Sequence, residues 1–160
     1  MSELKSSIQK YRNAKRNKND KEHTGGLLVW NKKPEFMYGN EEKIVFILSG
    51  ISRNQLDAFK NTAGLNYDQL ADMLAVSRAT LFKRKEKEKY NRAMSERVFL
   101  LADLYSYGYA VFDNREHFKN WMKTENTALG NRKPIDLLET VYGIFEVKNI
   151  IGRIAYGVFS

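Results

Sequence analysis

The sequence predicts an all-α protein: a basic N-terminal arm, a helix-turn-helix domain and a second compact helical domain. From Glu41 onward apolar residues recur with the 3.6-residue period of helices, and no segment shows the two-residue period of a strand or an internal repeat. The chain has 160 residues, of which 42% are hydrophobic, enough to bury a real core. We place the limits at residues 1–40 for the arm and linker, 41–97 for the helix-turn-helix domain and 98–160 for the C-terminal domain.

The N-terminal segment differs in composition from the remainder of the chain. Its first 25 residues mix Lys, Arg, Asn and Ser with few apolar side chains, so we expect a disordered basic arm. After Gly25 and Gly26, residues 27–30 (Leu-Leu-Val-Trp) form an apolar patch, which is either a strand or a docked loop.

Capping and turn residues mark the helices that follow. Ser52 and Asn66 each stand three residues before a glutamine, the spacing of a capping box. Breaks are expected at Gly50, Gly64, Asn66, Ala75, Asn91, Asn114 and 127–133.

Three later segments carry apolar stripes. The helix from Ser95 to Phe112 aligns Val98, Leu101, Ala102, Tyr105, Tyr109 and Phe112, and Tyr105, Tyr107 and Tyr109 can belong to the core, to a dimer seam or to both. Pro134 suits the first turn of a helix that bears Ile135, Leu137, Leu138 and Val141. A last helix aligns Val147, Ile150, Ile151, Ile154 and Val158.

The positive charge is concentrated in two places. The net charge is +8, and residues 1–22 carry +4 and residues 78–97 carry +5, whereas the remainder carries −1. This distribution favours a polyanion as partner.

The second basic patch overlaps a motif. Residues 67–84 hold a short amphipathic helix, a tight turn and a second helix, which is helix-turn-helix spacing. Small Ala71 allows close approach, Val76 fills the corner and Ser77 caps the second helix, whose N-terminal end would enter the major groove. Arg78, Thr80, Lys83 and Arg84 fall on or near one face, so the candidate DNA-binding residues are Ser77, Arg78, Thr80, Lys83, Arg84 and Lys85.

Two observations bear on this motif. Ala75 stands where glycine usually takes a left-handed conformation, which costs roughly 1 kcal/mol. The alternative interpretation is an ordinary pair of amphipathic helices with a solvated basic face.

The composition argues against catalysis. The chain has no cysteine, His23 and His117 lie far apart, and no glycine-rich phosphate loop or metal-ligand spacing is present. We therefore expect no enzyme, no cofactor and no metal. No apolar run approaches the roughly 18 residues of a membrane span, and no signal peptide is visible, so we expect a cytoplasmic protein that joins the nucleoid when bound to DNA.

Several motifs resemble a known family. Gly50-Ile51, Leu70-Ala71, Ser77 to Leu81, Lys83 to Lys85 and Ser95 to Arg97 resemble the N-terminal half of the Xre antitoxins that neutralise RES-domain toxins. In the second half, Phe112-Asp113, Trp121-Met122, Asn126, Ala128 to Gly130, Pro134 to Leu138, Gly143 and Gly152 to Phe159 are similar to the Xre/MbcA/ParS toxin-binding domain. Asn131 departs from the family, which has glycine there, but asparagine tolerates left-handed geometry.

The resemblance implies an antitoxin that dimerises, binds its own operator and blocks a RES-type NAD-degrading toxin in a larger toxin-antitoxin complex. The implied toxin-binding residues are Trp121, Leu129, Gly130, Pro134, Arg153, Tyr156, Gly157, Val158 and Phe159. Arg153 and Tyr156 are three residues apart and are expected to share a helix face, before a chain end that docks either on its own domain or on a partner. A rival hypothesis is a freestanding transcription regulator whose C-terminal half only dimerises or binds a small ligand.

Overall fold

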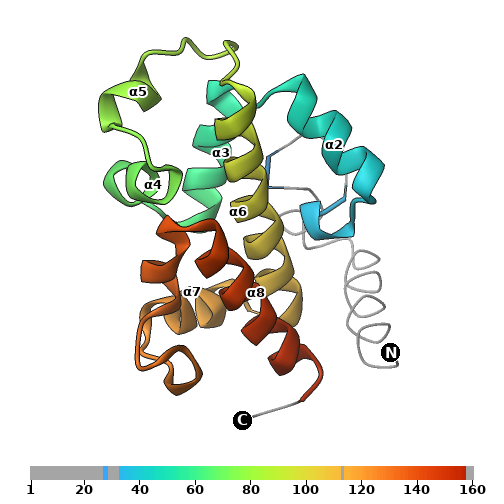
Figure 1. Ribbon diagram of the computed structural model, residues 1–160, viewed down its shortest axis with the longest axis vertical. Helices are drawn as coiled ribbons and strands as arrows, with labels where there is room; N and C mark the ends of the chain where they lie inside the picture. The colour runs from blue at the N-terminus through green and yellow to red at the C-terminus, as the bar shows by residue number, and fades with distance from the viewer. Residues whose placement is uncertain (1–26, 29–32, 113, 158–160) are drawn as a thin grey trace.

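The computed structural model describes residues 27–28, 33–112 and 114–157, and these residues confirm the all-α prediction (Figure 1). They contain no strand, and only two isolated bridges, Ser52 with Lys89 and Asn126 with Arg132, pair extended residues. The expected basic arm lies outside them. The elements are η1 (Glu35–Met37), α2 (Asn40–Ser49), α3 (Arg53–Ala63), α4 (Tyr67–Leu74), α5 (Arg78–Phe82), α6 (Arg92–Val111), α7 (Arg115–Lys123), η2 (Thr127–Leu129), η3 (Pro134–Glu139) and α8 (Val141–Ala155).

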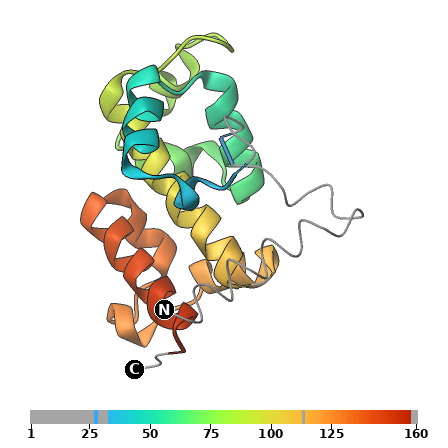
Figure 2. The same cartoon turned by 90° about the vertical axis from the view of Figure 1, so that its right-hand side faces the viewer.

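Helix α6 is the axis of the molecule. It has 20 residues and packs against α2, α3, α4, η1, α7 and α8, so that both predicted domains share it (Figures 1 and 2). Helices α4 and α5 lie beside its N-terminal half, and α7 and α8 beside its C-terminal half. Because one core runs along the whole helix, the limit between residues 97 and 98 falls inside a continuous element and stays a prediction.

The helix starts follow the expected capping chemistry. The Ser52 hydroxyl accepts from the backbone N–H of Gln55 and the Asn66 side chain from that of Gln69, and both glutamines reach back to the cap residue. These reciprocal bonds satisfy backbone donors that a helix start otherwise leaves unpaired. Both predicted capping boxes are confirmed.

The interpretation of residues 134–141 as one helix was wrong. The segment Pro134–Glu139 is a 3-10 helix, and Thr140 has an extended backbone with φ −124°. The Thr140 hydroxyl accepts from the Gly143 N–H at 3.0 Å and starts a new helix there. Val141 is therefore a first-turn residue of α8 and is exposed, and the last helix begins well before Val147.

The three tyrosines of α6 have different environments. Tyr105 is 1% exposed and makes edge contacts with Phe59 and Phe118, so it belongs to the core. The half-buried Tyr109 donates from its hydroxyl to the Thr62 carbonyl at 3.0 Å. Tyr107 faces a surface groove. Of the alternatives that the sequence left open, the core one therefore holds for Tyr105.

Residues 27–28 are docked on the domain. Leu27 and Leu28 are buried in a turn, and the Leu28 N–H donates to the Glu35 carboxylate at 2.9 Å. Glu35 is 1% exposed, and its burial raises the pKa of its carboxyl. The docked alternative therefore holds for these two leucines, whereas Val29 and Trp30 lie outside the described residues.

Candidate functional site

The helix-turn-helix motif is formed by α4, a left-handed turn and α5. Ala75 has φ 53° and ψ 43°, so it occupies the left-handed region that the sequence indicated. The Val76 N–H donates to the Ala71 carbonyl at 3.1 Å, and the Ser77 hydroxyl accepts from the Thr80 N–H at 3.2 Å. The turn therefore pairs its backbone despite its strain and directs the N-terminal end of α5 outward.

The first residue of α5 is partly oriented by its neighbours. The Arg78 guanidinium donates to the Asp68 carboxylate at 3.2 Å, and its centre lies 5.9 Å from the centroid of the Phe82 ring. Both ends of the ion pair are more than half exposed. An exposed pair of this kind is worth little energy, so a stronger anion can replace Asp68.

Three of the predicted DNA contacts, Lys83, Arg84 and Lys85, follow the last residue of α5. Helix α5 ends at Phe82, Lys83 is its C-cap, and Arg84 and Lys85 belong to the loop of residues 83–90. The expected common helix face for Arg78, Thr80, Lys83 and Arg84 was therefore wrong in its second half. These side chains are nevertheless exposed, apart from the half-buried Thr80, and no ion pair holds Lys83 or Arg84 among the described residues.

The basic loop is docked on the N-terminal end of α3. The N–H groups of Arg53 and Asn54 donate to the carbonyls of Glu88 and Glu86 at 3.1 and 3.0 Å, and the Tyr90 N–H donates to Ile51 at 2.9 Å. These hydrogen bonds fix the backbone of the loop that carries the exposed lysines and arginines. Less conformational entropy is therefore lost when these side chains bind phosphate.

Arg53 and Tyr90 hold α5 itself, and sequence reasoning missed both. Arg53 Nη1 and the Tyr90 hydroxyl donate to the Leu81 carbonyl at 3.0 and 2.8 Å. Burial raises the pKa of Tyr90, which keeps this donor protonated. A helix of five residues is unstable alone, and these two donors satisfy a carbonyl that its C-terminal end would leave unpaired.

One base of the second patch is structural. Arg97 Nε donates to the Met73 carbonyl at 2.6 Å, and its Nη2 donates to the Glu139 carbonyl. Arg97 therefore ties the end of α4 to η3, and two backbone carbonyls already occupy its guanidinium.

The predicted toxin-binding residues separate into core and surface groups. Leu129 and Pro134 are buried, and Trp121 is half-buried against Phe112 and Phe118. Gly130 is exposed at the tip of the loop between α7 and η3, with φ 67°, and Asn131 beside it has φ 59°. The left-handed geometry expected of Asn131 is confirmed, and the loop is closed by the bond from the Asn126 N–H to the Arg132 carbonyl at 3.1 Å.

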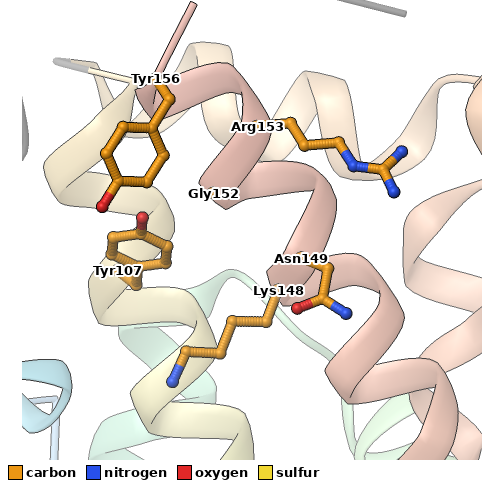
Figure 3. Close-up of a pocket in the computed structure, with 6 residues that line it drawn as sticks. All are labelled: Tyr107, Lys148, Asn149, Gly152, Arg153 and Tyr156. Carbon is orange, nitrogen blue, oxygen red and sulfur yellow. The ribbon is translucent and has the colours of Figure 1, made fainter. Parts of the chain in front are cut away.

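Arg153 and Tyr156 line a groove at the C-terminal end of α8. The groove has a volume of about 620 Å³ and is also lined by Tyr107, Lys148, Asn149 and Gly152. Figure 3 shows the hydroxyls of Tyr107 and Tyr156 turned toward one another and Arg153 directed away from them. Tyr156 caps α8, which ends at Ala155, so the expected shared helix face of Arg153 and Tyr156 is not formed. Gly157 follows with φ 67°, and Val158 and Phe159 lie outside the described residues.

A buried carboxylate connects this groove to the first domain. Asp103 of α6 is 3% exposed and accepts from Lys43 of α2 at 3.0 Å and from Lys148 of α8. Lys148 extends from the groove toward α6 (Figure 3). Two lysines from opposite sides therefore share one carboxylate, and the sequence held no signal for this contact across 60 and 45 positions.

Sequence reasoning also missed two exposed aromatic side chains on α8. Tyr142 is 89% exposed and Phe145 is 47% exposed, and they precede the exposed Asn149 and Arg153 along one side of the helix. Aromatic residues and arginine are the residues that protein interfaces favour. The spacing of 142, 145, 149 and 153 would have identified this surface, because these positions lie at intervals of three and four.

Within residues 27–28, 33–112 and 114–157, no three His, Asp or Glu side chains are grouped so that they could hold a metal ion. No helix in this part of the chain is long and apolar enough to cross a membrane.

Comparisons with known proteins match two consecutive parts of the chain to two family domains. Residues 45–103 match the antitoxin Xre-like helix-turn-helix domain, and residues 108–157 match the antitoxin Xre/MbcA/ParS C-terminal toxin-binding domain. The chain is 30% identical over 131 residues to the Prs ADP-ribosylating antitoxin of a Sphingobium species, covering 74% of this chain and 81% of the relative. It is 28% identical over 116 residues to antitoxin Xre of Yersinia enterocolitica, covering 71% and 78%.

A helix-turn-helix domain joined through one helix to a toxin-binding domain defines the class of the protein as an antitoxin. The chain belongs to the Xre family of antitoxins. The family resemblance of both halves is therefore confirmed.

Proposed function

We propose that this antitoxin neutralises a RES-type toxin that degrades NAD and represses its own operon as a homodimer. One observation carries the proposal: α5 and the C-terminal end of α8 lie at opposite ends of α6 (Figure 1), the first beside the exposed bases of residues 78 and 83–85 and the second beside the groove. One chain can therefore hold DNA and a protein partner at the same time.

At the DNA end, we assign base reading to Arg78 and phosphate contacts to Lys83, Arg84 and Lys85. An arginine at the start of a helix in the major groove can donate two bonds to guanine O6 and N7. The cations of the loop lie on a held backbone beside α5, where phosphates would flank the groove. The side chains of Ser77 and Thr80 share a hydrogen bond at 2.9 Å at the start of α5. We assign to this helix start a contact between its backbone N–H groups and a DNA phosphate.

At the partner end, we assign direct contacts to Arg153, Tyr156, Gly157, Val158 and Phe159. Exposed Tyr142 and Phe145 extend this surface along α8, and Gly130 adds the tip of its loop. Trp121, Leu129 and Pro134 act as positioning residues because their side chains pack inside the domain. The chain end seals the entrance to the toxin's active site, since a protruding segment can enter a concave site.

The test is co-expression with the protein encoded beside this chain, which we expect to be a RES-type toxin. The full chain should co-purify with the toxin and preserve growth and cellular NAD. Truncation after Ala155 should abolish protection, while the thermal midpoint and binding to the operon's promoter remain. A truncated chain that still protects, or one that unfolds because residues 156–160 cover its own core, contradicts the assignment. A chain that binds the promoter but no neighbouring toxin supports the freestanding regulator.

A further inference from the structure

Helix α2 presents an uncovered aliphatic surface. Ile44, Val45 and Leu48 are 56%, 58% and 61% exposed, and Glu41 is exposed beside them. Positions 41, 44, 45 and 48 follow the i, i+3, i+4, i+7 spacing of one helix face. The other side of α2 is buried: Phe46 is 1% exposed and its ring lies 5.3 Å from that of Phe99. An apolar stripe of this kind on a charged domain marks an interaction surface.

The position of α2 leaves both candidate sites free. Figure 1 shows α2 on the opposite side of α3 and α6 from α5, and the view turned by 90° in Figure 2 agrees. A partner on α2 would therefore cover neither α5 nor the groove of α8. The toxin and the operator have surfaces of their own, so the α2 face calls for a third occupant.

The charges around this face are self-complementary. Glu41 lies in the first turn of α2, at its N-terminal end. At the C-terminal end, the exposed Lys89 donates from Nζ to the Ser49 carbonyl at 2.5 Å. The face is therefore acidic at one end, aliphatic in the middle and basic at the other. A two-fold axis near Ile44 and Val45 would place each Glu41 beside the other copy's Lys89 and the aliphatic side chains against each other.

We infer that the α2 face is the seam of the homodimer, with a second copy of this chain as its occupant and the two α2 helices antiparallel. The inference rests on the homodimer of the proposed function and names its interface. The three aliphatic side chains form the apolar centre, and Glu41 and Lys89 form the rim. A stable dimer buries about 800 Å² on each partner, so the seam extends to the neighbouring residues. The two-fold axis leaves both α5 helices exposed for two operator half-sites.

The first experiment measures the mass of the full chain alone by light scattering, with no DNA or toxin present. The wild type should have twice the mass of the 18.6 kDa chain, and Ile44→Lys with Leu48→Lys should have the mass of one chain. Asn120→Lys with Thr127→Lys adds the same charge at exposed positions and should remain dimeric. Because all four positions are exposed, circular dichroism and the unfolding midpoint should not change.

The second experiment tests the orientation of the seam. Glu41→Lys should weaken dimerisation about fivefold to tenfold, because two like-charged pairs replace two attractive ones. Adding Lys89→Glu to that variant should restore the wild-type dimer affinity, which a merely sticky apolar patch would not do. A failed restoration contradicts the antiparallel seam.

Other outcomes overturn the inference. A monomeric wild type or a dimeric Ile44→Lys, Leu48→Lys variant excludes α2 as the seam. Loss of the dimer on deletion of residues 1–26 assigns the contact to the arm. The dimer measurements need no toxin, so they test the seam independently of toxin neutralisation. Toxin binding by the monomeric Ile44→Lys, Leu48→Lys variant is measured separately, and its retention would leave the proposed neutralisation intact.

Discussion

The two ends of α6 are built on different physical principles. The DNA end relies on polar contacts: α5 has five residues, and Arg53 and Tyr90 hold its Leu81 carbonyl. The partner end relies on close backbone packing, because the Gly143 position of α8 lies directly beneath the Leu137 carbonyl. The DNA end can therefore lose its hydrogen bonds one at a time, each at a small cost in stability. The partner end has no room for an added side-chain atom at Gly143.

The largest expected effect is a loss of stability at the partner end. Gly143→Ala would force a Cβ into the Leu137 carbonyl oxygen, and we expect it to lower the free energy of unfolding by about 3 kcal/mol or more. Gly152→Ala is the matched control on the same helix. Its Cβ would lie 3.8 Å from the Tyr107 hydroxyl, and alanine's helix propensity should add up to about 1 kcal/mol. Urea unfolding measures both, and equal stability of the two variants would refute the contrast.

The next effect tests the polar end through DNA. Arg78→Ala with Lys83→Ala should lower the salt slope of log K by about one unit, because Lys83 binds phosphate. Discrimination between operator and other DNA should fall by roughly 1 to 3 kcal/mol, because Arg78 reads a base. Promoter binding across a salt series measures both quantities. Lys123→Ala with Lys133→Ala removes the same charge elsewhere and should change neither quantity, and an unchanged Arg78 and Lys83 variant excludes the assigned interface.

A smaller effect on the free energy of unfolding is expected at the left-handed turn between α4 and α5. Ala75→Gly should raise the free energy of unfolding by about 1 kcal/mol, because glycine adopts φ 53° without strain. Ala79→Gly, an exposed position inside α5, should lower it by up to about 1 kcal/mol. Chemical denaturation of both variants gives the signs. Two changes of the same sign would mean that the turn is not strained.

The smallest expected effect concerns pH and two carboxylates near α2. Burial, with the negative charge of Asp103, raises the pKa of Glu35. The contribution of Glu35 to folding stability is therefore fully present below its pKa in the unfolded chain, and it is lost as the pH rises through its pKa in the folded protein. Lys33 lowers the pKa of Glu42, so that contribution is present above the unfolded value and lost as pH falls. Thermal midpoints are measured from about pH 4 to about pH 8. At the high end of this range, Glu35→Gln should raise the midpoint relative to the wild type and Glu42→Gln should lower it. The same direction for both would be inconsistent with their environments.

The elements that local chemistry defines could be predicted from the sequence. The caps at Ser52, Asn66 and Ser77 and the left-handed turn at Ala75 depend on atoms within a few residues. The family resemblance added the division into two functional halves. The break at Thr140 was missed because the apolar period runs through it, although a threonine three residues before Gly143 carries a capping signal.

The contacts that complete the sites could not be predicted, because they join residues far apart in the chain. Arg53 reaches Leu81 across 28 positions, and Lys148 reaches Asp103 across 45. The apolar run of residues 44–48 was visible, but only the packing of Phe46 on α6 shows which of its side chains remain exposed. The sequence assigned Leu129, Gly130 and Pro134 to toxin binding together. Only the structure shows that Leu129 and Pro134 are buried and that Gly130 is exposed.

The most direct test of the central claim compares toxin and promoter affinity in two double variants of the full chain. Arg153→Ala with Tyr156→Ala should lose at least about tenfold in toxin affinity while promoter binding stays within about twofold. Arg78→Ala with Lys83→Ala should show the reverse pattern. The account predicts that each variant loses one partner only. A variant that loses both partners, or an Arg153 and Tyr156 variant with wild-type toxin affinity, would contradict the separation of the two functions along α6.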